Sequence, residues 1–263
     1  MLLDTKSAVI YGAGGAVGAA VARAFAREGA HVFLTGRTLA SVDSLAGEIS
    51  ATGATAEAAL VDALDEEAVE KHLASIAEKT GRIDISFNAI GIPQQGMQGI
   101  PLTALSVESF ALPVVTYMRS HFITARAAAK RMVERKSGVL LMHTPEPARL
   151  GAPLIGGMAP AWAAMEALSR DLSAEFASQG VRAVCLRSTG LPETATIDVV
   201  FGLHAKALGI SRKEFQALME GMSHNRRSTT LMELANAAVF AASDLSSAMT
   251  GAVINLTGGK VVD

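Results

Sequence analysis

The chain has 263 residues, of which 50% are hydrophobic and 18% charged, and its formal net charge at pH 7 is −2. This apolar content is sufficient for the core of one large domain, because α/β folds often extend to about 250 residues as a single unit. The charge gives no basis for binding nucleic acid or an anionic membrane, since both partners require a strongly basic surface.

Cys185 is the only cysteine, so no disulfide can form within the chain and a reducing compartment is expected. The strand pattern begins at Ser7, which leaves no room for a signal peptide. No apolar run approaches the ~20 residues that a membrane span needs. We therefore expect a cytoplasmic protein without a membrane partner.

Short apolar runs alternate with segments of helical periodicity along the whole chain. The predicted strands cover residues 7–11, 31–35, 55–61, 83–88, 138–144, 182–187 and 252–256. The predicted helices cover residues 16–28, 39–51, 66–80, 110–135, 161–178 and 231–243. Nearly continuous apolar strands are typical of parallel strands that are buried on both faces. The pattern predicts a Rossmann-type α/β fold, with a doubly wound, seven-stranded parallel sheet and helices on both faces.

One segment interrupts this alternation, between the sixth predicted strand and the last predicted helix. Residues 190–228 contain two short helical patterns and no strand. An insertion at this point lies at the carboxyl edge of the sheet, where open α/β sheets bind ligands. We expect residues 1–263 to form a single dinucleotide-binding domain, with a helical lid or substrate insertion at about residues 190–228.

A glycine-rich loop follows the first predicted strand and leads into the first predicted helix. Its residues are Gly12, Ala13, Gly14, Gly15, Ala16, Val17 and Gly18. Glycine allows a tight turn and a close approach by a pyrophosphate, and the helix N-terminus supplies free N–H groups and partial positive charge. In this strand-to-helix context the loop predicts a dinucleotide site.

The end of the second predicted strand indicates which dinucleotide is bound. NAD-binding proteins of this fold carry an Asp or Glu there, which bonds the ribose 2′-hydroxyl. This chain has Gly36 and Arg37 instead, and a guanidinium is suited to a 2′-phosphate. The expected cofactor is therefore NADP(H), although Arg37 as a solvated charge at the start of a helix is the alternative.

These motifs resemble the short-chain dehydrogenase/reductase family over nearly the whole chain. The loop Gly12–Gly18 is similar to the family's TGxxxGxG, with Tyr11 for the threonine and Ala16 for the middle glycine. The resemblance implies that Asp62 binds the adenine ring and that residues 88–91 correspond to the family's NNAG motif. The cofactor contacts expected in total are Gly12, Gly14, Gly15, Ala16, Val17, Gly18, Gly36, Arg37, Asp62, Ala63, Asn88, Ala89, Ile90, Ser188, Thr189 and Gly190.

The same resemblance implies an unusual active site. The family uses a tyrosine as proton donor, a lysine that lowers its pKa, a serine that holds the carbonyl and an asparagine that anchors a water. The corresponding positions hold Met158, Trp162, Pro145 and Tyr117 in this chain. The wider tyrosine spacing of the enoyl-reductase branch would select Ile155, with Trp162 still in place of the lysine. Ordinary carbonyl reduction by the family mechanism is therefore not expected.

Three polar residues near these positions remain as catalytic candidates. His143 lies two residues before Pro145 and is expected to face the same side of the sheet, Glu146 follows directly, and Tyr117 projects from the long helix. Together they could form a proton relay. Their structural alternatives are a hydrogen-bonded histidine at a strand end, a solvated loop charge and a core aromatic side chain. The six histidines show no paired ligand spacing, so no metal site is expected.

Three functions remain open on this basis. The first is an NADP(H)-dependent oxidoreductase with a non-standard active site, acting on a small, largely apolar substrate. The second is a catalytically inactive NADP-binding sensor or structural subunit, and the third is an isomerase- or lyase-type reaction on the same fold. The family resemblance also implies a homo-oligomer, either a tetramer or a dimer.

Overall fold

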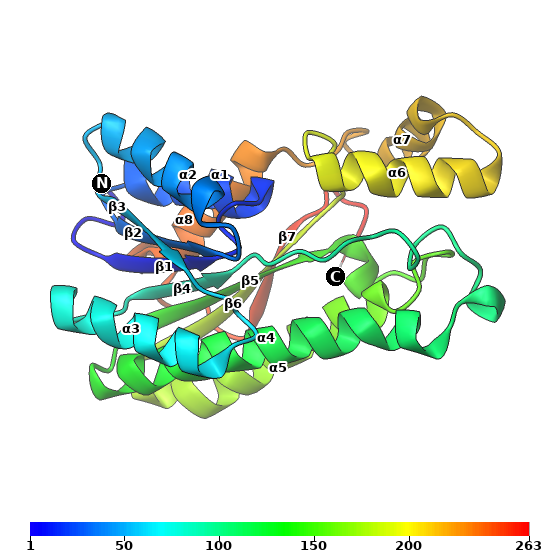
Figure 1. Cartoon of the computed structure of the whole chain (residues 1–263). Coiled ribbons are helices and arrows are strands. Elements are labelled where there is room, and N and C mark those ends of the chain that lie inside the picture. The colour runs from blue at the N-terminus through cyan, green and yellow to red at the C-terminus, as the bar shows by residue number, and fades with distance from the viewer. Residues whose placement is uncertain (263) are drawn as a thin grey trace.

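A seven-stranded parallel sheet runs through the computed structural model, which describes residues 1–262 (Figure 1). The strand order is β3-β2-β1-β4-β5-β6-β7. The strands are β1 (Ser7–Tyr11), β2 (His31–Gly36), β3 (Ala56–Leu60), β4 (Ile85–Asn88), β5 (Gly138–Pro145), β6 (Val181–Ser188) and β7 (Ala252–Leu256). The order reverses between β1 and β4, and a crevice for ligands opens at such a point.

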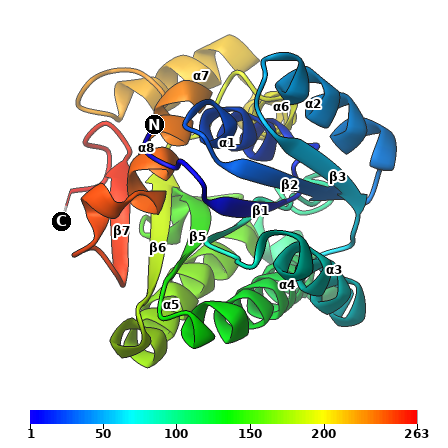
Figure 2. The same cartoon turned by 90° about the vertical axis from the view of Figure 1, so that its left-hand side faces the viewer.

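Two layers of helices cover the sheet, with α1, α2 and α8 on one face and α3, α4 and α5 on the other (Figure 2). The helices are α1 (Ala16–Arg27), α2 (Leu39–Ala51), α3 (Glu66–Thr80), α4 (Val107–Glu134), α5 (Met158–Phe176), α6 (Ala195–Leu208), α7 (Arg212–Gly221) and α8 (Leu231–Ala242). Short 3₁₀ helices are η1 (Leu102–Ala104), η2 (Glu146–Ala148), η3 (Ala177–Gln179) and η4 (Asp244–Ser246). The predicted fold class is confirmed.

The two helices nearest the expected active site begin three residues earlier than predicted. Helix α4 begins at Val107, because the Ser106 hydroxyl accepts a hydrogen bond from the Ser109 N–H and caps the helix. Helix α5 begins at Met158. Pro160 is tolerated within its first turn because N–H groups there have no helical acceptor. The earlier start places Met158 inside the helix.

Helices α6 and α7 occupy the segment predicted as an insertion and lie beyond the carboxyl ends of the strands, at the upper right of Figure 1. Their rings pack edge to face, with the centroids of Phe201 and Phe215 5.3 Å apart. Buried apolar side chains of both helices form a cluster separate from the two main cores. This arrangement places a helical wall over the end of the sheet.

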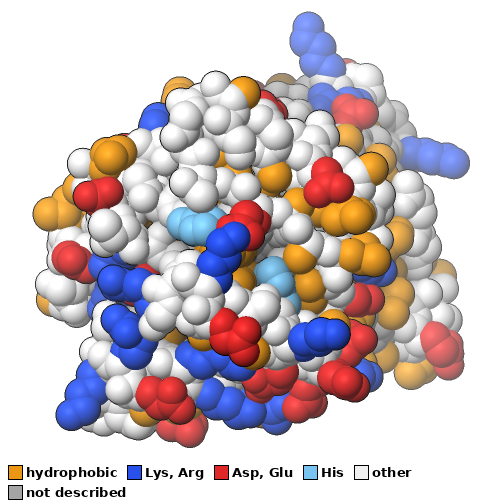
Figure 3. Space-filling view, turned by 60° about the vertical axis from the view of Figure 1, so that its left-hand side comes forward, with side chains coloured by type: hydrophobic (Ala, Val, Ile, Leu, Met, Phe, Trp, Pro, Cys, Tyr) orange, Lys and Arg blue, Asp and Glu red, His pale blue; other side chains and the backbone are white. Residues whose placement is uncertain are grey.

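The outer surface is mixed in charge. In Figure 3 acidic and basic side chains are interspersed over the visible face. Within residues 1–262 no helix combines the length and the apolar character needed to cross a bilayer.

Candidate cofactor and substrate site

A cavity of about 790 Å³ lies at the carboxyl ends of the strands. The glycine-rich loop and the ends of β2, β4 and β5 line one part of it, and α5, α6 and α7 line the other. Apolar side chains dominate the second part. The volume lies within the range of about 300 to 1,000 Å³ that is typical of ligand pockets.

The glycine-rich loop is shaped by close backbone contacts. Gly12 has a φ of 70°, and a Cβ atom on it would lie 2.7 Å from the carbonyl oxygen of Ala89. A Cβ atom on Gly18 would lie 2.6 Å from the carbonyl oxygen of Gly12. Gly18 is not among the residues that line the cavity, and the close approach to Gly12 shows that it serves the packing of α1 against the loop. Gly14 and Gly15 do line the cavity.

The N-terminus of α1 opens onto this cavity. Gly15 is the N-cap residue, and no side chain bonds the helix there. The N–H groups of the first turn are therefore available to an anion, with the helix dipole adding partial positive charge. This is the chemistry that a pyrophosphate requires.

The predicted adenine-end residues line the same cavity. Arg37 is exposed and makes no ion pair with any residue of the described part of the chain. Asp62 is half-buried, and its Oδ1 accepts a hydrogen bond from the Leu64 N–H at 3.0 Å. Thr38 and Ser41 also line this end and were missed by the sequence analysis, because short polar residues at a helix start ordinarily signal capping.

Asn88 ties the end of β4 to the long helix α4. Its amide nitrogen donates to the hydroxyls of Ser120 at 3.2 Å and Thr124 at 3.1 Å. Its Oδ1 accepts from the Ile90 N–H at 3.1 Å. These bonds hold the backbone of residues 88–90 in place along the cavity wall.

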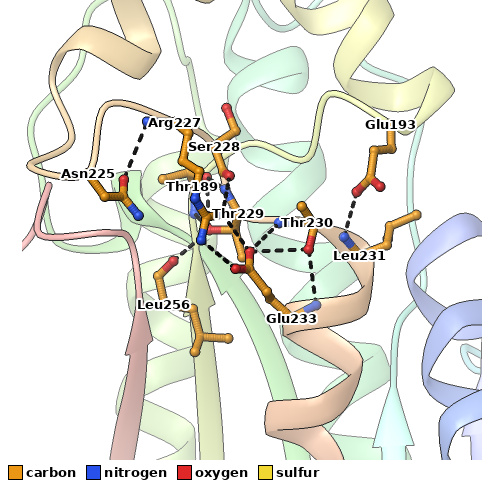
Figure 4. Close-up of polar contacts among 10 residues, drawn as sticks. All are labelled: Thr189, Glu193, Asn225, Arg227, Ser228, Thr229, Thr230, Leu231, Glu233 and Leu256. Atoms are coloured by element: carbon orange, nitrogen blue, oxygen red, sulfur yellow. Dashed lines mark hydrogen bonds and ion pairs between the residues drawn. The ribbon is translucent and has the colours of Figure 1, made fainter.

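A polar network holds the segment after β6 (Figure 4). The Thr229 N–H donates to Thr189 Oγ1 at 2.7 Å, and Thr229 Oγ1 donates to the Leu256 carbonyl at 2.5 Å. Thr189 and Gly190 line the cavity, whereas Ser188 is fully buried beneath it. The network therefore joins the ends of β6 and β7 to the segment before α8, and fixes this part of the predicted cofactor wall.

An ion pair closes the same network at the start of α8. Arg227 contacts Glu233 at 2.5 Å, and this contact is the main reason that the pKa of Glu233 falls to about 2. Glu233 also completes a capping box with Thr230. The ion pair with Arg227 and the capping box with Thr230 thus both attach the loop before α8 to the first turn of that helix.

The hydrogen bonds of His143 determine its tautomer. Ser188 Oγ donates to the Thr189 carbonyl at 2.8 Å, so its only hydrogen is already used. The 2.8 Å contact between His143 Nε2 and Ser188 Oγ therefore has the histidine N–H as donor, and Nδ1 is left as an acceptor. Burial lowers the pKa of His143 to about 4. At neutral pH this side chain is uncharged, and Nδ1 is available as a hydrogen-bond acceptor.

Glu146 is buried rather than a solvated loop charge. Its Oε1 lies 2.8 Å from Lys260 Nζ, and the Glu146 and Lys260 side chains are 5% and 4% exposed. Both residues line the cavity. Lys260 was not predicted from the sequence, because it lies 114 positions after Glu146 and no local signal indicates the contact.

A second polar wall connects α6 to the segment after β4. Gln94 donates to the Ile92 carbonyl at 2.6 Å, and Gln98 donates to Gln94 Oε1 at 2.5 Å. Gln98 Oε1 lies 3.0 Å from His204 Nε2. The Ile92 carbonyl can only accept, so the Gln94 amide N–H is its donor and Gln94 Oε1 is left to accept from the Gln98 amide N–H. Gln98 Oε1 is then the acceptor of the last contact, and His204 Nε2 must be its donor. None of these three side chains was predicted from the sequence as part of a site.

Comparison with known proteins identifies this architecture. The family model described as enoyl-(acyl carrier protein) reductase matches residues 12–260. The chain belongs to the short-chain dehydrogenase/reductase family. This is a family of oxidoreductases whose fold binds a nicotinamide cofactor.

Several short-chain dehydrogenases are similar over nearly the whole chain. L-rhamnose 1-dehydrogenase (NAD(P)(+)) of Azotobacter vinelandii is 29% identical over 269 residues, which cover 100% of this chain and 99% of that protein. Gluconate 5-dehydrogenase of Gluconobacter oxydans is 28% identical over 260 residues, covering 99% and 96%. The solved gluconate 5-dehydrogenase from Burkholderia cenocepacia, in complex with NADP and tartrate, is 25% identical, with a TM-score of 0.86 over 98% of this chain and 96% of that one.

The four residues expected from the sequence at the positions of the family's tetrad all line the cavity. Tyr117, Met158 and Trp162 pack together in one apolar cluster, and Pro145 ends β5 beside them on the cavity wall. Burial raises the pKa of Tyr117 to about 12, although a hydrogen bond from the Ile92 backbone opposes this shift. The Tyr117 hydroxyl is therefore protonated at neutral pH.

The predicted proton relay has its three members on one cavity, but they do not touch. Within residues 1–262 no hydrogen bond joins Tyr117, His143 and Glu146 to one another. Each has another partner: Ile92, Ser188 and Lys260. A relay through all three would need a substrate or water between them.

The described residues contain no cluster of His, Cys, Asp and Glu side chains that could hold a metal ion. Cys185 is fully buried, and burial raises its pKa to about 12. Its thiol is therefore not a nucleophile at neutral pH.

Proposed function

We propose that this short-chain dehydrogenase/reductase is an NADP(H)-dependent oxidoreductase with a non-standard active site, acting on a small, largely apolar substrate. The observation that carries the cofactor proposal is Arg37, an exposed guanidinium at the end of β2 where a carboxylate would select NAD. The NADP in the Burkholderia cenocepacia gluconate 5-dehydrogenase supports the same choice.

Several residues fit the cofactor. The first-turn N–H groups of α1 would hold the pyrophosphate, Arg37 the 2′-phosphate and Asp62 the adenine. When bound, the nicotinamide would supply or accept a hydride. The remainder of the cavity, which Met158, Trp162 and α6 line, would then hold the substrate.

The chain's own side chains would position the reacting oxygen by hydrogen bonds. His143 Nδ1 would accept the hydrogen of a substrate hydroxyl, because its Nε2–H is committed to Ser188. Tyr117 is protonated and would donate to a substrate oxygen. A neutral acceptor and a neutral donor replace the tyrosine–lysine pair of the family in this proposal.

We also propose a homo-oligomer in the cytoplasm. Helix α4 carries exposed large apolar side chains, which a second copy would cover: Val107, Phe110, Leu112, Val115 and Phe122. A free, buried cysteine fits a reducing compartment.

Calorimetry with the two cofactors tests the proposal. NADPH is expected to bind about tenfold to a hundredfold more tightly than NADH, because charge-assisted hydrogen bonds contribute about 1.5–3 kcal/mol. Arg37→Asp should reverse the order, whereas the matched change Arg149→Asp, at an exposed arginine outside the cavity wall, should leave the ratio unaltered. Equal affinities in the unmodified protein would refute NADP selection.

Hydride transfer is then tested by following the nicotinamide absorbance with a panel of ketones and secondary alcohols. Turnover with any of them supports the oxidoreductase. Tight NADPH binding without turnover would favour the inactive sensor or structural subunit, which Met158 and Trp162 at the tyrosine and lysine positions would explain.

A further inference from the structure

The buried ion pair of Glu146 and Lys260 joins two segments at the cavity wall. Glu146 opens η2 directly after β5, and Lys260 lies in the segment that follows β7. Nζ and Oε1 are 2.8 Å apart, and both side chains are at most 5% exposed. Both residues line the cavity that is proposed to hold the substrate.

The pair is incomplete as a set of hydrogen bonds. Glu146 Oε2 is shielded from solvent and has no hydrogen-bond partner among residues 1–262. The Lys260 ammonium has three N–H donors, and its one described bond is to Glu146 Oε1. One acceptor and at least one donor therefore remain unused side by side.

A second buried ion pair, Glu166 with Arg187, lies outside the cavity, and there both carboxylate oxygens have hydrogen-bond partners. Glu166 Oε1 accepts from Arg187 Nε at 2.8 Å and from Thr144 Oγ1 at 2.9 Å, and Oε2 accepts from Arg187 Nη2 at 2.6 Å. Neither Glu166 nor Arg187 lines the cavity. Since buried ion pairs rarely stabilise more than apolar side chains of similar volume, stability alone does not account for the open pair at Glu146.

We infer that Glu146 and Lys260 form a substrate subsite that binds a hydroxyl group. Glu146 Oε2 accepts the hydrogen of the hydroxyl, and the Lys260 ammonium donates to its oxygen. The pair has no net charge, so it selects an uncharged group, while apolar side chains that line the same cavity, among them Leu150, Ile155 and Met222, accommodate an apolar body. The inference rests on the proposed function for the presence of a substrate, and it names that substrate as an apolar molecule carrying a hydroxyl.

The experiment compares two probes that differ in one hydrogen-bond donor. Phenethyl alcohol and methyl phenethyl ether share an apolar body, and the ether cannot donate to Glu146. Their affinities for the full chain are measured by ligand-observed NMR titration, with and without NADPH. The alcohol should bind about tenfold more tightly than the ether.

Variants then locate the hydroxyl. In Glu146→Gln the amide oxygen faces Lys260, so an N–H group replaces the free acceptor, and the preference for the alcohol should disappear. The apolar double variant Glu146→Leu/Lys260→Met should bind both probes equally. The matched control Glu166→Gln alters the buried pair outside the cavity and should retain the preference.

Three results overturn the inference: equal affinities in the unmodified protein, no binding of either probe, or a preference that survives both Glu146 variants. Because the readout is equilibrium binding, it is separate from turnover. Failure to bind NADPH would refute the proposed function, and the titration without cofactor would still decide the subsite.

Discussion

Replacing His143 by glutamine tests the protonation state on which its proposed role depends. Burial lowers the pKa of His143 from 6.5 to about 4. The unfolded chain therefore binds a proton between these values that the folded chain does not bind. The free energy of unfolding must fall as the pH falls through this window.

The magnitude follows from the shift. A difference of about 2.5 pKa units, at 1.36 kcal/mol per unit, corresponds to a decrease of about 3 kcal/mol in the free energy of unfolding, which is complete below pH 4. Within the window the free energy of unfolding changes by about 1.4 kcal/mol per pH unit. His143→Gln removes this contribution, because glutamine does not titrate. The linkage contribution is zero at neutral pH, where His143 is uncharged in both the folded and the unfolded chain, so the variant should differ from the unmodified protein mainly below pH 6.5, with a stability that depends less steeply on pH.

Urea unfolding, followed by circular dichroism at several pH values within the window, measures the slope. Burial also lowers the pKa of His121, to about 4, and the pKa values of His72 and His204, so the variant should retain the contributions of these three histidines. The exposed His224 provides the control, and His224→Gln should leave the slope unaltered. An unchanged slope in His143→Gln would mean that His143 is charged or solvated in the folded protein, and the acceptor role of Nδ1 would be wrong.

Two further substitutions test the packing around the active-site positions. Gly157→Ala should destabilise the fold by about 1–3 kcal/mol or more, because the added Cβ would lie 1.8 Å from the Phe110 carbonyl oxygen. Thermal unfolding measures the loss. Gly151→Ala is the control, because a Cβ atom on Gly151 would meet nothing within 4 Å. Met158→Tyr/Trp162→Lys is expected to give no strong ketone reduction in a steady-state assay, because Pro145 provides no hydroxyl to hold the carbonyl. Robust turnover by that double variant would show that the rest of the pocket already fits the family mechanism.

The sequence alone was sufficient for the fold class and for the glycine-rich loop that lines the cavity. Apolar periodicity and the glycine-rich loop are local properties, so the strands and helices could be read from neighbouring residues. Gly12 illustrates this: it has a left-handed φ, and a Cβ atom on it would lie 2.7 Å from the Ala89 carbonyl oxygen, so the position requires the glycine that the loop motif provides. The predicted helix boundaries were less accurate. Helix α4 begins earlier because a serine caps it, and α5 begins earlier because a proline is tolerated in its first turn.

The chemistry of the substrate end was decided by the tertiary structure. Lys260 meets Glu146 only because the segment after β7 returns to the end of β5, and no local pattern in the sequence encodes a contact over that separation. The state of His143 likewise depends on Ser188 in the neighbouring strand β6, whose register places it beside Pro145. Burial removes water from these polar side chains, so each can form hydrogen bonds only with the groups that are packed beside it. Those neighbours come from distant parts of the chain, and the local sequence does not indicate them.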